Sequence, residues 1–276
     1  MTRKLFIAVD IEGVAGVASV DQLGPGQFEW QKAREWMTAE AAAAAQAGLD
    51  AGFDSIIVAD GHGNAQNILP EGLPDRTRLV RGWPRPLLQM DGIDEPGVVA
   101  CMMVGFHGAQ AGPRGVLAHT YHGGLFADVR LNGVACSETY LNAALAGECG
   151  VPTVLVTGDD AACAEVNGWA PYIETCAVKR AVSWKSVDGV SPGEGARRVK
   201  TAATTALDRL GEIPPFRVDG PYVLDLVFSN RVSAEILSLL PCFSVVDPFT
   251  ARFSATTMRA VIQAISFAIF YPRAML

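Results

Sequence analysis

The sequence predicts an α/β protein with a mostly parallel sheet, helices on both faces of the sheet, and a site at the C-terminal strand ends. Two observations predict this class. Short apolar runs alternate with helical stretches along the 276 residues, an order typical of strand–helix–strand units. The runs are also apolar at nearly every position, as expected for parallel strands that are covered on both faces.

The first part of the chain begins with a strand and a long helix. Residues 4–9 predict a buried strand, because all of them after Lys4 are apolar. Residues 29–51 predict a helix, because five consecutive alanines occupy positions 41–45 and alanine is the best helix former. Further strands are expected at 55–59 and 98–104.

The middle of the chain predicts a hairpin, a helix and a strand. Residues 126–131 and 134–136 flank Asn132-Gly133, a pair that suits a type I′ turn. A helix is expected to begin at 137 and to run to about 145, and a strand follows at 153–157.

The later part is expected to continue in the same style. Ser191 and Glu194 form a capping-box pattern around Pro192, which predicts a helix that runs to about residue 210. Three further elements are expected: strands at 222–228 and 243–247 and a helix at 255–270. A single domain over 1–276 is favoured, with a possible division near 150 or 215, where Gly211–Gly220 is the best linker candidate.

Composition and charge exclude several classes of protein. The formal net charge is −7 and the pI is about 5.1, without a basic stripe, so nucleic-acid binding is not expected. The most apolar stretch, residues 260–271, is too short for a membrane span. No signal peptide is recognised, and the six cysteines form no C-x-x-C pair, so a cytoplasmic protein with reduced thiols is expected.

Acidic and imidazole side chains follow three of the predicted strands. Asp10 and Glu12 share one face because side chains in a strand alternate, and they repel each other unless a cation or a basic side chain pairs with them. Asp60 and His62 follow the second strand, and His107 follows the third. Ligands bind at this end of open α/β sheets, and mixed carboxylate and imidazole ligands suit Zn, Mn or Fe.

Further candidates lie later in the sequence, and several of them have two interpretations. His119 and His122 lie in a Gly-rich stretch that is typical of a catalytic loop. Glu138 is either a metal ligand or an acid placed by the helix dipole. Asp159 and Asp160 either bound the same sheet edge or cap a helix, and Lys179 is either a pocket cation or a surface lysine.

Seven segments together resemble a known family. They are V-D-I-E-G, D-G-H-G, G-F-H-G, G-V-L-A-H-T, N-G-x-x-x-S-E, V-T-G-D-D and the helical A-R-E-W-M-T-A-E. Their types and order are similar to those of the zinc-dependent D-aminopeptidases of the DppA type, over about residues 4–179. The chain departs from the family pattern at 19–28 and in its C-terminal third.

The resemblance implies two zinc ions per subunit. Asp10 matches the bridging ligand, Glu12 and Glu138 match ligands of one ion, His62 and His107 match those of the other, and His119 matches the catalytic histidine. Asp60 is expected to accept a hydrogen bond from a metal-bound imidazole. The family also implies a homodecamer of pentameric rings.

The reaction that this resemblance implies is hydrolysis of the N-terminal peptide bond of short D-amino-acid peptides, such as D-Ala-D-Ala, by a metal-activated water. His119 is expected to act as a general acid or base. Two alternatives stay open. One is another metal-dependent hydrolase, an amidase or phosphatase, although the grouped histidines and the missing phosphate loop argue against a phosphatase. The other is a non-catalytic metal-binding assembly protein.

Overall fold

The computed structural model describes residues 2–271 and contains two sheets. The strands are β1 (Lys4–Val9), β2 (Ser55–Asp60), β3 (Thr77–Val80), β4 (Val98–Phe106), β5 (Phe126–Leu131), β6 (Val134–Ala135), β7 (Thr153–Asp159), β8 (Glu174–Ser183), β9 (Ser186–Gly189), β10 (Tyr222–Phe228), β11 (Phe243–Asp247) and β12 (Thr250–Ala255). The helices are α1 (Trp30–Asp50), α2 (Glu138–Glu148), α3 (Asp160–Trp169), α4 (Pro192–Asp208), α5 (Arg231–Leu237) and α6 (Met258–Phe270). Short 3-10 turns lie at η1 (Val20–Gln22), η2 (Pro70–Gly72), η3 (Leu88–Met90) and η4 (Leu210–Glu212).

The larger sheet has the strand order β3-β2-β1-β4-β7-β8-β9, and its strands are parallel except for the antiparallel pair β8–β9. This arrangement confirms the predicted α/β class with a mostly parallel sheet. Strand β1 pairs with β2 on one side and β4 on the other, so that Val9 lies opposite both Asp60 and Val104. The carboxyl ends of these three strands therefore meet at one edge of the sheet.

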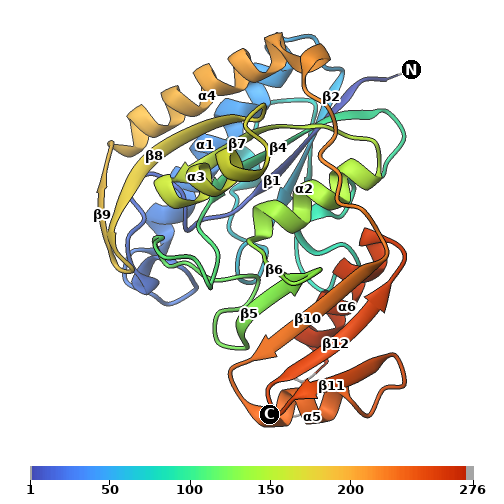
Figure 1. The fold of residues 1–276 in the computed structure, drawn as a ribbon. Helices are drawn as coiled ribbons and strands as arrows, with labels where there is room; N and C mark the ends of the chain where they lie inside the picture. Colours follow the sequence, from blue (N-terminus) through green and yellow to red (C-terminus); the bar gives the residue numbers. More distant parts are fainter. Residues whose placement is uncertain (1, 272–276) are drawn as a thin grey trace.

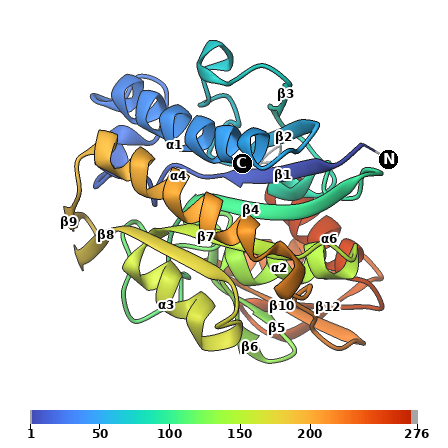
Figure 2. The ribbon, with the colours of Figure 1, turned by 90° about the horizontal axis from the view of Figure 1, so that it is seen from above.

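Each face of this sheet packs against its own set of helices (Figure 2), with α1 and α4 on one face and α2 and α3 on the other. Helix α6 lies on the side of α2 and packs against α2 and the smaller sheet. Along β1, Leu5 and Ile7 pack against the first set, whereas Phe6 and Ala8 pack against the second. All four are fully buried. The continuous apolar run of β1 follows from this, because both faces of the strand are covered.

The smaller sheet is antiparallel and has the order β11-β12-β10-β5-β6; Figure 1 shows it at the lower end of the molecule beside α5 and α6. The strands predicted at 222–228 and 243–247 and the last helix are confirmed as β10, β11 and α6, but the expectation that the later part extends the parallel sheet is wrong, because these strands form a separate antiparallel sheet. Leu224 of β10 pairs with Leu131 of β5 and with Phe253 of β12. The hairpin around Asn132-Gly133 was predicted, but its strand β5 joins a partner more than 90 residues away, a pairing that local pattern does not encode.

The capping box predicted at the start of α4 does not form. Pro192 is the first helical residue, as expected, but the Ser191 side chain makes no capping hydrogen bond. The carboxylate of Glu194 instead pairs with Arg197 at 2.7 Å and Arg198 at 3.0 Å. Arginines three and four residues further along a helix lie next to such a carboxylate, so they compete for it with the backbone of the cap.

Six elements were not predicted from the sequence: β3, β8, β9, β12, α3 and α5. The last helix also begins at Met258 rather than at 255, because β12 extends to Ala255 and Thr257 caps the helix. Within residues 2–271, none of the helices combines the length and the apolar character that crossing a membrane requires. The division of the chain near 150 or 215 stays a prediction.

Candidate metal centre

Three strand ends bring the predicted ligands together. Asp10 directly follows β1, His62 follows β2 by two residues, and His107 directly follows β4. The backbone N–H of Asp10 donates to the Val104 carbonyl at 2.9 Å. Gly105 has a φ of +77°, and a Cβ at this position would lie 2.3 Å from the Asp10 carbonyl oxygen. Only glycine therefore allows the chain to pass this close to Asp10.

Glu138 reaches the same place from α2. It is the first residue of that helix, after the N-cap Ser137. One carboxylate oxygen, Oε1, accepts a hydrogen bond from the Tyr121 N–H at 2.7 Å, and the other accepts one from the Gln89 amide. The side chain is 1% exposed, so Glu138 points into the protein rather than into solvent as an ordinary first-turn acid would.

The donor atoms form compact groups. His62 Nδ1 lies 3.2 Å from Asp10 Oδ1 and 2.9 Å from Glu12 Oε2. His107 Nε2 lies 3.4 Å from Asp10 Oδ2 and 3.6 Å from Glu138 Oε1. Two groups therefore share Asp10, one with Glu12 and His62 and the other with His107 and Glu138. The resemblance pairs the ligands differently, with both glutamates on one ion and both histidines on the other.

Two buried donor atoms of this cluster lack a hydrogen-bond partner, Glu12 Oε2 and His107 Nε2. The Glu12 oxygen is close to His62 but is not aligned for a hydrogen bond. His107 Nδ1 lies 2.9 Å from the Gly108 carbonyl, and a proton on Nδ1 leaves the lone pair of Nε2 facing carboxylates. Such an arrangement is costly unless a cation lies between these atoms, and a mixed nitrogen and oxygen donor set suits zinc.

The electrostatics of the cluster also favour a cation. Burial raises the pKa of Asp10, but the close imidazoles of His107 and His62 outweigh it and hold this pKa well below its ordinary value. Burial lowers the pKa of His107, but Asp10, Glu138 and Glu12 raise it to about 10. The pKa of Glu138 is raised, first by burial. In the absence of a metal ion, the carboxylates therefore keep the neighbouring imidazoles protonated, and these imidazolium groups supply the positive charge.

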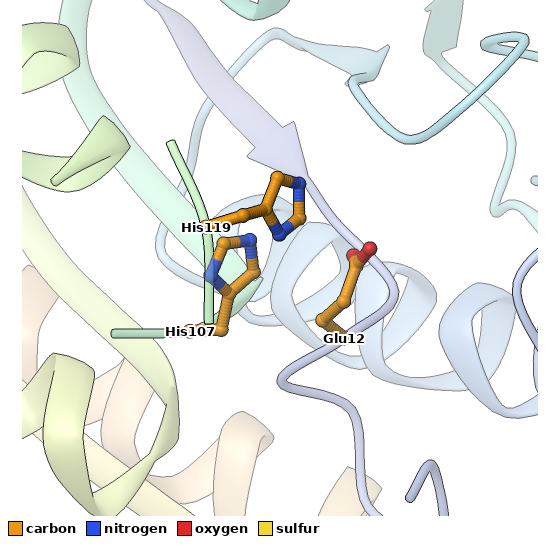
Figure 3. Close-up of side chains that lie close together, drawn as sticks. All are labelled: Glu12, His107 and His119. Carbon is orange, nitrogen blue, oxygen red and sulfur yellow. The ribbon is translucent and has the colours of Figure 1, made fainter. Parts of the chain in front are cut away.

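His119 lies at the edge of this cluster (Figure 3), where its ring stacks on that of His107 with a centroid distance of 4.3 Å and an angle of 15°. Its Nδ1 lies 2.9 Å from the Leu117 carbonyl, and its Nε2 lies 3.8 Å from Glu138 Oε1. The side chain is 20% exposed, in contrast to the buried ligands. Glu12, His107 and His119 form a third compact group, so His119 can contact both the centre and a bound substrate.

A cavity lies beside the cluster, and both His119 and His122 line it. Its Nδ1 accepts a hydrogen bond from the Leu125 N–H at 3.0 Å. This bond holds the Gly-rich loop that follows His119, so His122 is placed to shape the cavity.

Asp60 does not hold the His62 ring as expected. Its carboxylate accepts hydrogen bonds from the backbone N–H groups of His62 at 3.3 Å, Asn67 at 2.5 Å and Ile68 at 2.8 Å. The ring of His62 turns instead toward Asp10 and the Leu23 carbonyl, which lies 2.7 Å from Nε2. A sharp turn after β2 leaves several backbone N–H groups unpaired, and the buried carboxylate satisfies them.

Asp159 follows the helix-capping interpretation, whereas the Asp160 carboxylate contacts β8 and Arg114 instead of capping the helix. Asp159 is the N-cap of α3 and accepts from the Ala162 N–H at 2.8 Å. It also accepts from the Val116 N–H at 2.7 Å, which ties the segment before His119 to the sheet. Asp160 accepts from the Ala181 N–H at 2.9 Å.

Lys179 is neither a pocket cation nor a surface lysine. It is buried, and its ammonium group donates to the carbonyls of Glu12, Val14 (2.8 Å) and Val17 (2.6 Å). From the other side, Glu40 of α1 accepts from the Ala15 N–H at 3.0 Å. These contacts fix residues 12–17, the loop that carries Glu12. Burial lowers the pKa of Lys179 to about 8.

Sequence reasoning missed Gln89, Tyr121 and Glu40, all of which contact the centre or its supporting loop. Tyr121 lies between His119 and His122 in the sequence, so its place in the motif was a usable signal. Glu40 ends the helical segment A-R-E-W-M-T-A-E that resembles the family, so that segment was a usable signal, whereas the segment of Gln89 contains no sign of a site. Only the folded chain brings them to Glu138 and Ala15.

The fold and the cluster define the class, an α/β protein with a buried cation site of carboxylates and imidazoles. The family model for M55 peptidases, described as D-aminopeptidase, matches residues 3–267, and the chain therefore belongs to this family. A D-aminopeptidase of Bacillus subtilis (strain 168) is 29% identical over 262 residues, which are 95% of this chain and 94% of that protein. The solved structure of the Zn-dependent D-aminopeptidase DppA from Bacillus subtilis, a self-compartmentalizing protease, superposes with a TM-score of 0.91 at 27% identity and covers 96% of each chain.

Proposed function

We propose that this protein is a dinuclear zinc D-aminopeptidase that removes the N-terminal residue from short D-amino-acid peptides. The observation that carries the proposal is the buried pair of unpartnered donors, Glu12 Oε2 and His107 Nε2, within a cluster of three carboxylates and two imidazoles. Membership of the D-aminopeptidase family and the zinc dependence of the structural relative agree with it.

The residues that would hold the two ions are those of the cluster. Asp10 belongs to two of the compact donor groups, so it is the residue placed to serve both ions, and the remaining ligands are Glu12, His62, His107 and Glu138. When bound, zinc polarises the peptide carbonyl and lowers the pKa of the attacking water. The chain orients these ligands through Gln89 and Tyr121 on Glu138 and through Lys179 on the loop of Glu12.

His119 is the residue placed to transfer a proton. Its Nδ1 faces the Leu117 carbonyl, which favours a proton on Nδ1 and leaves Nε2 to exchange a proton with the reacting groups. Its side chain is partly exposed, unlike those of Glu12 and His107, and it borders the cavity beside the cluster. A proton donor at this position stabilises the departing amine, and a covalent bond to the imidazole is not required.

The finer properties rest on the resemblance and on the relative. We propose a homo-oligomer, specifically a decamer of pentameric rings, because the structural relative is a self-compartmentalizing protease. Ten chains of 29.2 kDa would give a mass of about 290 kDa by light scattering. A mass near 29 kDa would contradict this assembly. The cytoplasmic location stays a prediction.

The function is tested with the purified protein. We expect two zinc ions per chain by elemental analysis and hydrolysis of D-Ala-D-Ala in preference to L-Ala-L-Ala. Asp10→Asn is expected to lose zinc and activity together, because both donor groups share Asp10. Asp50→Asn, on the exposed end of α1, is the matched control. Zinc without turnover on any peptide would favour a non-catalytic role, and turnover of a phosphate ester alone would favour a phosphatase.

A further inference from the structure

A cavity of about 230 Å³ adjoins the candidate metal centre and is lined by two chemically different sets of residues. One set consists of groups of the centre, namely Asp10, His62, His119 and Glu138. The other set is apolar and consists of Trp83, Leu88, Ile269 and Phe270. We call these four residues the apolar wall. A ligand in this cavity therefore contacts the reacting groups and an apolar surface at once.

The apolar wall is held in place by contacts to the centre. The Trp83 indole N–H donates to the Gly63 carbonyl at 2.9 Å, next to the ligand His62. The Arg85 guanidinium lies over the Trp83 ring at 3.8 Å, and the Phe270 ring lies 5.9 Å from the same ring. The wall therefore has a defined position relative to the ligand loop, as a binding subsite requires.

The nearby polar side chains are already engaged within the protein. The Gln89 amide donates to Glu138 and accepts from Asn142 at 2.7 Å. The Tyr121 hydroxyl donates to Asn142 at 2.9 Å. A charged substrate side chain placed against the wall would lose its hydration without gaining a partner, whereas an apolar side chain gains by burial.

A second cavity lies on the other side of His119, and it includes Glu12, Leu23 and Trp184. His119 and the two glycines at 123 and 124 line both cavities. A peptide that lies across His119 would therefore place one residue in each cavity. The free amino group of the substrate is cationic. Two carboxylates of the centre, Asp10 and Glu138, line the cavity of the apolar wall, against one, Glu12, in the second cavity, so the N-terminal residue belongs in the cavity of the apolar wall.

We propose that the apolar wall is the subsite for the side chain of the substrate's N-terminal residue and that it selects large apolar side chains over that of alanine. This inference rests on the proposed aminopeptidase function and names its substrate class: peptides that begin with a D-residue such as phenylalanine or leucine. The four residues act on specificity by contact with the substrate side chain.

The test compares three dipeptides on the zinc-loaded protein: D-Phe-D-Ala, D-Ala-D-Phe and D-Ala-D-Ala. We expect kcat/KM for D-Phe-D-Ala to exceed that for D-Ala-D-Ala by about tenfold or more, because a buried aromatic side chain contributes more than a methyl group. A gain for D-Ala-D-Phe instead would overturn the assigned position. Equal values for all three would overturn the subsite while leaving the aminopeptidase function intact, and no hydrolysis at all would overturn both.

A variant and a turnover-independent measurement complete the test. Phe270→Ala is expected to lower the ratio of kcat/KM for D-Phe-D-Ala over D-Ala-D-Ala by about tenfold. Phe267→Ala, on the same helix but outside this cavity, leaves the ratio unchanged. D-phenylalaninamide is expected to raise the melting temperature of the wild-type protein more than D-alaninamide does. Equal thermal shifts, or an unchanged ratio in Phe270→Ala, would contradict the proposal.

Discussion

Glu40→Gln is expected to change how stability depends on pH. Glu40 is 1% exposed, and only one of its carboxylate oxygens has a hydrogen-bond partner, the Ala15 N–H. Burial raises its pKa from 4.5 to about 7, although the Ala15 hydrogen bond and the charge of Lys179 act in the opposite direction. The folded protein therefore binds a proton at Glu40 over a pH range in which the unfolded chain has released it.

The sign and size follow from this difference. A raised pKa in the folded state gives a contribution to stability that is complete below pH 4.5 and is lost as the pH rises to about 7. Each pH unit between these values removes about 1.4 kcal/mol. Between pH 5.0 and pH 7.5 the wild-type protein should therefore lose about 2 kcal/mol of unfolding free energy through Glu40 alone. Glutamine keeps an acceptor for Ala15 and does not titrate.

The assay is urea unfolding of the metal-free protein at pH 5.0 and pH 7.5, so that zinc release does not contribute. The stability of Glu40→Gln relative to wild type should rise by about 2 kcal/mol over this range. The exposed Glu35 on the same helix provides the control, since Glu35→Gln should leave the pH dependence as in wild type. A pH-independent difference between Glu40→Gln and wild type would refute the reasoning.

Three further predictions concern the centre. His119→Asn should retain zinc and lower kcat by about 10²–10⁴-fold; activity within tenfold of wild type would contradict its role in proton transfer. Gln89→Leu should weaken zinc binding by about 10–100-fold in a chelator competition, because Glu138 loses a donor, whereas the exposed Gln31→Leu should not. Lys179→Met removes the donor from three carbonyls and should lower the unfolding free energy by about 2–4 kcal/mol; an effect as small as that of the exposed Lys185→Met would contradict the role of Lys179 in holding residues 12–17.

The sequence was most informative where local pattern and tertiary structure agree. Strand β1 is apolar from Leu5 to Val9 because both of its faces are covered, so its place in the sheet was predictable. The positions of Asp10, His62 and His107 after three strands also predicted a shared edge, because parallel strands align their carboxyl ends. The pairing register of β1 with β2 and β4 brings these three residues together as that rule requires.

Tertiary structure decided the features that depend on contacts between distant segments. In the second sheet, β10 pairs with β5 on one side and with β12 on the other. Strands β5 and β10 are more than 90 residues apart, and their antiparallel pairing is not encoded in the local pattern of either. Lys179 and Glu40 are a further example, because their neighbours in sequence indicate nothing of the loop they hold.

The sequence by itself determined the α/β class and the donor types of the centre, since alternation, glycine turns and the order of acids and histidines are local properties. Only the tertiary structure decided which buried groups orient those donors and which apolar residues face them. Trp83 and Phe270 are separated by almost 190 residues and contribute to the same cavity wall. Their proximity depends on the packing of α6 against α2 and the smaller sheet, and packing is a property of the whole chain.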